Sequence, residues 1–227
     1  MRNRYCQLIL SMVVISASLF FTSCGTTTIK GSGNIVTESR SVSGYTAFSF
    51  SGAGDLNITQ GDTESLSITT DGNLMDYIES SVQGGTLHIQ FSNGVSLDPS
   101  EGIDFDISVI ELNSVTFSGA GSLEADSLNV DAATFDIEVS GVAECGIAGS
   151  VEEQNISASG TLDYDGADFE CSTATVDISG VGDVTVWVSD TLDVVISGVG
   201  NVYYWGSPST TTDISGIGDV QALGAKP

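Results

Sequence analysis

The chain has 227 residues, of which 41% are hydrophobic and 7% aromatic, with 27 Gly and only 3 Pro, and this composition suits one folded domain or two small ones and excludes a disordered chain. All 30 acidic residues follow residue 37, and only Lys30, Arg40 and Lys226 are basic after Cys24, so this part carries 3 − 30 = −27. Such a field repels phosphate backbones, which excludes nucleic acid as a partner.

The first 24 residues are typical of an export signal. Two arginines precede a short apolar run, Leu8–Phe21, which is shorter than the roughly 20 residues that a membrane span needs. The run ends in Phe-Thr-Ser-Cys24, which resembles the lipobox of bacterial lipoproteins, where small residues precede a cysteine that is diacylated. We therefore predict a signal peptide over residues 1–23 and lipid attachment at Cys24; ordinary secretion with a coincidental cysteine is the alternative.

The lipid anchor determines the expected location. Two or three acyl chains hold a protein stably on a membrane, and residues 24–33 are predicted to form a polar tether. Gly25 follows the cysteine, and no Asp stands there to indicate retention at the inner membrane. The resemblance thus implies an outer-membrane lipoprotein, with its domain facing either the periplasm or the outside.

Residues 34–110 contain strand patterns without a clear period. Apolar and polar residues alternate in five segments, which is typical of half-buried strands. The segments are Thr46–Phe50, Leu56–Thr59, Ser65–Thr70, Thr86–Phe91 and Ile103–Ile110. Leu74–Ser80 is predicted to form a turn or a short helix. We expect this section to begin the same stack of sheets as the rest of the chain; a separate small domain is the alternative.

The second half of the chain is an internal repeat. The octapeptide DISGVGDV (Asp177–Val184) returns as VISGVGNV (Val195–Val202) and DISGIGDV (Asp213–Val220), at a constant interval. Apolar residues stand one and three positions before most Ser-Gly anchors and five positions after them, which is the period of a strand that turns at the glycine. The anchors begin at Ser118, Ser140, Ser159, Ser179, Ser197 and Ser215, and an earlier copy begins at Ser51.

These units predict an all-β fold over residues 34–223, a β-solenoid whose coils are about 18–22 residues long. One unit cannot bury its apolar face alone, whereas stacked units can, because each strand pairs with its equivalent about 4.8 Å away. Glycine is expected at the corner because it accepts positive φ, and we expect a right-handed coil. An open end of such a stack favours self-association, so a homo-oligomer is one expected assembly.

The chain resembles a known family in three segments and in their order. These are Gly31–Asp62, the run TDGNLMDYIES and the Ser-Gly-x-Gly-Asp repeats. The family is the auto-transporter adhesin "head GIN" domain, a domain of unknown function in exported proteins and lipoproteins of Gram-negative bacteria. The resemblance covers about residues 31–222. It implies an all-β, solenoid-like body and an adhesin-like role, and it carries over no catalytic or binding residue.

Common catalytic motifs are missing from the sequence. The only histidine, His88, alternates with Leu87 and Ile89 and should face solvent and not a nucleophile. No nucleophile elbow, P-loop or zinc-ligand spacing occurs. We predict that the protein is not an enzyme and needs no cofactor.

Carboxylates recur four positions after several anchors. If the coils stack, Glu144, Asp163 and Asp183 lie about 5 Å apart, which makes them weak candidates for a calcium site. A tight turn also favours Asp and Asn, so a structural role is the simpler interpretation. A polysaccharide-active enzyme is the least favoured alternative, because no basic residue accompanies these carboxylates.

Two tryptophans define the surface most suited to binding. Trp187 and Trp205 both stand eight positions after their anchors, and Tyr203 shares their outward parity. Stacked exposed indoles can bind a glycan or a protein, although they can also simply cover a corner of the solenoid.

An exported protein can form disulfides, so a bridge between Cys145 and Cys171 is one alternative. The two cysteines stand at different offsets from their anchors, which favours two unpaired thiols.

Together these features favour a non-enzymatic cell-envelope lipoprotein that acts as an adhesin-like or ligand-binding solenoid. A purely structural or envelope-stress role is the alternative, and the sequence alone does not separate the two.

Overall fold

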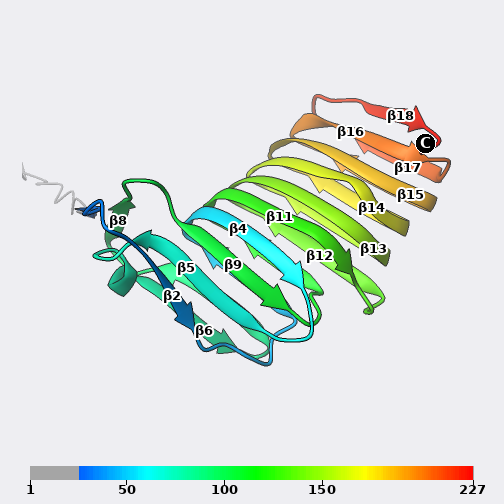
Figure 1. The fold of residues 1–227 in the computed structure, drawn as a ribbon. Helices are drawn as coiled ribbons and strands as arrows, with labels where there is room; N and C mark the ends of the chain where they lie inside the picture. Colours follow the sequence, from blue (N-terminus) through cyan, green and yellow to red (C-terminus); the bar gives the residue numbers. More distant parts are fainter. Residues whose placement is uncertain (1–25, 227) are drawn as a thin grey trace, which may run out of the picture.

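A computed structural model describes residues 26–226, and Figure 1 shows them as one long stack of strands with the N-terminal part at one end and the C-terminus at the other. The predicted signal peptide and Cys24 lie outside the described residues. The regular part contains β10 (Ser114–Phe117), β11 (Ala120–Asn129), β12 (Thr134–Val139), β13 (Val142–Ala158), β14 (Thr161–Ile178), β15 (Val181–Ile196), β16 (Val199–Gly206), β17 (Ser209–Ile214) and β18 (Val220–Gly224).

Each repeat forms one coil of the predicted solenoid. The strands before and after the Ser-Gly corner pair in parallel with their equivalents in the next coil, so that Ile156 lies beside Val176 and Val176 beside Val194. The apolar columns point inward, and members such as Ile178, Val184 and Ile196 are completely buried. The prediction of an all-β solenoid is therefore confirmed.

The corner glycines are explained by close packing and not by positive φ. A Cβ on Gly160 would lie 2.0 Å from the carbonyl oxygen of Gly141, and one on Gly180 would lie 2.0 Å from that of Gly160. None of these three glycines has a positive φ. At these corners the expectation of a positive φ was wrong: the backbones of successive corners approach so closely that no side chain fits between them. Positive φ occurs only in the two earliest copies of the corner, at Gly54 (152°) and Gly121 (150°).

The N-terminal section belongs to the same stack. It contains β1 (Thr27–Lys30), β2 (Ile35–Arg40), β3 (Ala47–Ser51), β4 (Ala53–Gln60), β5 (Ser65–Asp71), a single 3₁₀ turn η1 (Met75–Tyr77), β6 (Ile78–Gln83), β7 (Thr86–Phe91), β8 (Val95–Asp98) and β9 (Asp104–Val109). All five predicted segments form strands, and none extends more than one residue beyond its strand. The turn or short helix predicted over Leu74–Ser80 is confirmed only at η1, because Ile78–Ser80 already belong to β6.

The coils do not stack in chain order. The coil made of β3 and β4 lies between β7 and β9 on one side and β10 and β11 on the other, all in parallel. The two near-identical segments SGAGDL (Ser51–Leu56) and SGAGSL (Ser118–Leu123) are therefore direct neighbours, although β5 to β9 lie between them in the sequence. Antiparallel strands finish this end, since β5 pairs with β9, β2 with β5, and β6 with β7.

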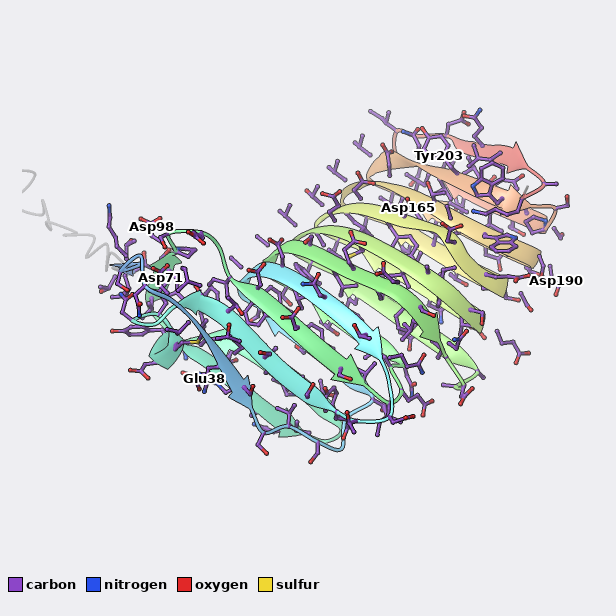
Figure 2. The ribbon with its side chains drawn as sticks, in the orientation of Figure 1. Glu38, Asp71, Asp98, Asp165, Asp190 and Tyr203 are labelled. Atoms are coloured by element: carbon purple, nitrogen blue, oxygen red, sulfur yellow. The ribbon has the colours of Figure 1, made fainter. Side chains whose placement is uncertain are left out.

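A buried carboxylate fixes the start of the described chain. Asp71 accepts hydrogen bonds from the backbone N–H of Ser100 (2.7 Å) and Gly33 (2.6 Å) and from the Ser100 hydroxyl (2.8 Å). These bonds lower the pKa of Asp71, and the bond from the backbone N–H of Ser100 has the largest effect. Figure 2 shows Asp71 and Asp98 at this end of the stack. Here β1 pairs in parallel with β8, so part of the predicted tether is a strand, as its β-branched residues allow.

The opposite end is open. Every residue of β17 is exposed, and β18 has only one residue that is even half-buried. β17 pairs only with β15, and β18 only with β16. The inward parity of this last coil includes Thr210 and Thr212, where earlier coils carry Leu192 and Val194. Self-association through this end remains a prediction.

Candidate ligand-binding surface

The aromatic surface lies on the outer side of β15 and β16. Trp187 is in register with Trp205, and Tyr203 pairs with Thr185, which in turn pairs with Asp165. Figure 2 shows Tyr203 and Asp165 on the same broad face. All three aromatic residues are half-buried. The prediction that the two indoles occupy neighbouring coils is confirmed.

A lysine of the chain itself occupies this surface. The Lys226 ammonium lies 5.5 Å from the ring centroid of Trp187 and 5.4 Å from that of Trp205. It also donates to the Ala167 carbonyl oxygen at 2.5 Å and to Asp168 Oδ1 at 2.8 Å. The Lys226 side chain is only 22% exposed. These four contacts form a cation site, because indole faces and carboxylates both attract an ammonium group.

A bulge in β14 brings Asp168 to the indoles. The pairing of β14 with β15 jumps from Gly166 opposite Val186 to Glu170 opposite Trp187, so residues 167–169 have no partner in β15. The backbone N–H of Ala167 donates to Asp165 Oδ1 at 3.0 Å within this bulge. Such bulges redirect side chains, and here the bulge places both oxygen contacts of the lysine beside the tryptophan pair.

Sequence reasoning missed Lys226 and Asp168. A signal was present, because Lys226 is the only lysine or arginine after Arg40, and because the interval from Ser159 to Ser179 is two positions longer than the interval from Ser179 to Ser197. The extra length accommodates the bulge. A contact between a terminal tail and the outer face of earlier coils does not follow the repeat, so the period could not reveal it.

An acidic pocket adjoins the lysine. It has a volume of about 180 Å³, and its lining includes Glu124, Asp126, Asp165 and Asp168. The pKa of Glu124 is raised, mainly by partial burial and further by the charges of Asp126, Glu144 and Asp165. Because only Asp168 of these four carboxylates has an ion pair with a basic residue in the described chain, the pocket retains a strongly negative potential.

The predicted carboxylate row exists on the same sheet. Glu144 pairs with Asp163, and Asp163 with Asp183, and the three line a shallow groove of about 550 Å³. Asn201 continues the row and donates from both its backbone N–H and its amide to Asp183 Oδ1, each at 2.9 Å. Within residues 26–226, no group of three or more His, Cys, Asp or Glu side chains is arranged to hold a metal ion.

Asp163→Asn is expected to stabilise the protein. The change removes the central charge of three in-register carboxylates, and relief of two like-charge contacts should raise the free energy of unfolding by about 0.5 kcal/mol. Urea titrations at low salt and at about 0.5 M NaCl measure this, because screening should remove most of the gain. Asp76→Asn, an equal charge change outside the row, serves as the control. If millimolar calcium stabilised the wild type and not Asp163→Asn, the row would instead be a cation site.

The two thiols of the described chain are inert. Cys145 and Cys171 are free and buried in the structure. Burial raises the pKa of each to about 12, so neither is a thiolate near neutral pH.

His88 is half-buried, whereas its sequence neighbours Leu87 and Ile89 are buried on the other face of β7. It lies opposite Ser49 and Ser81 in the adjacent strands, as expected for an outward strand residue.

Parallel coils around one buried core, with side chains displayed on flat outer sheets, define a β-solenoid protein. The chain belongs to the family described as "Putative auto-transporter adhesin, head GIN domain", whose model matches residues 44–208. This confirms the resemblance seen in the sequence. No curated protein matches the chain. In the described part of the chain, no helix has the length and apolar character needed to cross a membrane.

Solved structures share this fold. One, described as a "putative adhesin" from Bacteroides fragilis, has 21% identity and a TM-score of 0.73 and covers 86% of this chain and 100% of its own. A second, described as a "putative lipid binding protein" from Parabacteroides distasonis, has 22% identity and a TM-score of 0.57 and covers 87% of this chain and 100% of its own. At such identities the likeness establishes the fold and not a shared ligand.

Proposed function

We propose that this chain is an exported cell-envelope protein, anchored at the outer membrane through Cys24, that acts by binding and not by catalysis. The apolar N-terminal segment with its lipobox supports the anchor, and the description of the family as adhesins supports an envelope role. The binding surface is the group Trp187, Tyr203 and Trp205.

One observation carries the proposal: two indoles lie in register on an outer sheet face. The same outer face carries Asp165 and Thr185 in register with Tyr203, and the side chains that fill the core here are Val184, Val186 and Val188, so the aromatic side chains are not needed for the core. Tyr and Trp are the residues that supply most of the binding energy in interfaces, because they bury a large area at a small cost in conformational entropy. Glycans and protein segments are the two ligand classes that such a platform serves.

Tryptophan fluorescence tests this proposal directly. The chain has two tryptophans, and both lie in the proposed surface, so their emission reports on this site alone. We expect a saturable change in emission on titration with one class of cell-wall glycans, host glycans or envelope proteins. In Trp205→Ala, where Trp187 still reports, the affinity for the same ligand should be at least tenfold weaker. Tyr77→Ala, which removes a half-buried aromatic residue at the far end of the stack, should bind as the wild type does.

The proposal fails if Trp187→Ala and Trp205→Ala fold normally and leave every detected interaction unchanged, measured by an independent method such as calorimetry. That result would favour a structural or envelope-stress role, in which the phenotype follows the amount of protein and not the integrity of one surface.

A further inference from the structure

We propose that the tryptophan pair and Asp168 form a receptor for an ammonium group, and that Lys226 fills it as an internal ligand which a lysine-bearing segment of a partner protein replaces. The inference rests on the proposed function, because it names the ligand class of the same surface. It adds to that function a mechanism by which the chain occupies its own binding site.

The contacts of Lys226 are those that select a cation over a neutral group. The ammonium lies 5.5 Å and 5.4 Å from the two indole centroids. Both distances fall inside the limit for a cation–π interaction, which is about 6 Å. A carboxylate and a backbone carbonyl accept two of its three N–H bonds. A neutral hydroxyl of a sugar would gain neither the charge pairing with Asp168 nor the attraction of the two rings.

The surroundings extend this selectivity beyond one ammonium group. The acidic pocket shares Asp168 with the lysine site and continues to Asp165, Glu124 and Asp126. Lys226 contacts Asp168 of these residues, so the remainder of the pocket has no cation of the described chain within it. A partner segment with a second basic residue can place one amine on the indoles and the other in the pocket, which Lys226 alone does not do.

The internal ligand is held in a way that permits exchange. Lys226 stands two positions after the end of β18, and Gly224 before it has a φ of 99°, a conformation that turns the chain without strain only at glycine. β18 is largely exposed. β18 pairs with β16 as far as Gly224, so the backbone stays in place when the Lys226 side chain leaves, and an external amine that replaces this side chain disturbs no buried packing.

A short tether gives the internal lysine an effective concentration in the millimolar range. An external amine must compete with it, and the apparent affinity falls by the fraction of molecules in which the site is free. Removal of Lys226 should therefore raise the apparent affinity of an external lysine about tenfold, without any change to the residues that contact it.

The test titrates the full chain, in detergent, with N-acetyl-lysine methylamide and with a tetralysine peptide, read by tryptophan fluorescence. We expect Lys226→Gln to alter the emission before any ligand is added, and to bind both probes about tenfold more tightly than the wild type. Lys226→Arg, which keeps the cation, should remain close to the wild type. The neutral N-acetyl-norleucine methylamide should not bind, and Asp168→Asn in the Lys226→Gln background should weaken lysine binding at least tenfold.

Equal titration curves for the wild type and Lys226→Gln, or equal binding of the norleucine probe, would overturn the inference. Circular dichroism checks that each variant is folded. If one variant is not folded, the wild type titrated with the lysine probe and with the norleucine probe still tests whether the site selects an ammonium group. Glycan binding at the tryptophans without lysine binding would refute the ammonium receptor and retain the proposed function. Loss of both would refute both.

Discussion

Gly160→Ala is expected to lower the free energy of unfolding by about 3 kcal/mol or more, at the upper end of the range for overpacking. The new Cβ would lie 2.0 Å from the carbonyl oxygen of Gly141 and 2.6 Å from backbone atoms of Ser140. Backbone atoms of a neighbouring coil cannot rotate away as a side chain can. The two coils must therefore separate, which strains the hydrogen bonds and the packing on both sides of the corner.

Two other glycines provide matched controls. A Cβ on Gly61 meets its nearest atom, the Ser108 hydroxyl oxygen, at 3.6 Å, so Gly61→Ala should change stability by less than about 0.5 kcal/mol. Gly84 has open space around it but a φ of 59°, so Gly84→Ala should cost about 1 kcal/mol through backbone strain alone. Urea unfolding measures all three. If Gly160→Ala cost no more than Gly84→Ala, close approach of the coils would not be the reason for the corner glycines.

The repeat allowed the sequence to predict most of the fold. The Ser-Gly anchors locate the corners, and the apolar columns identify residues such as Val184 and Ile196 that are buried in the structure. The same columns place Trp187 beside Trp205. These predictions succeed because a parallel stack repeats one local environment, so a position in the repeat determines which way its side chain points.

The order of coils and the occupied cation site were not predictable in this way. Similar segments indicate that strands have similar environments, but not which of them lie side by side, and the β3–β4 coil pairs with β10 and β11 although β5 to β9 separate them in the sequence. Lys226 acts through a tail that belongs to no strand column. Long-range contacts of this kind depend on where the chain returns after the repeat ends, which no local pattern records.

The junction between the irregular and regular coils depends on Phe50. Its side chain is completely buried, and its ring centroid lies 5.4 Å from that of Phe105 in β9 and 5.1 Å from that of Phe117 in β10. Three neighbouring coils thus meet at one aromatic cluster. In a stack where each coil contacts only its neighbours, stability is shared through such interfaces.

Phe50→Ala should therefore cost about 4 kcal/mol, from the lost burial and the cavity that remains. It should also separate two unfolding events. Circular dichroism reports on strands throughout the chain, whereas fluorescence reports on Trp187 and Trp205 in the distant coils. We expect the two thermal midpoints to coincide in the wild type. In Phe50→Ala the midpoint by circular dichroism should lie below the midpoint by fluorescence, because the coils that contain β3, β4, β7 and β9 lose their attachment to the rest of the stack.

Phe50→Leu is the matched control, because it keeps most of the volume and should cost less than about 1.5 kcal/mol with coincident midpoints. Coincident midpoints in Phe50→Ala at a lower temperature would contradict the separation, since they would mean that the coils unfold as one unit even without the aromatic cluster. The interfaces between backbones, at the glycine corners and in the strand ladders, would then hold the stack together on their own.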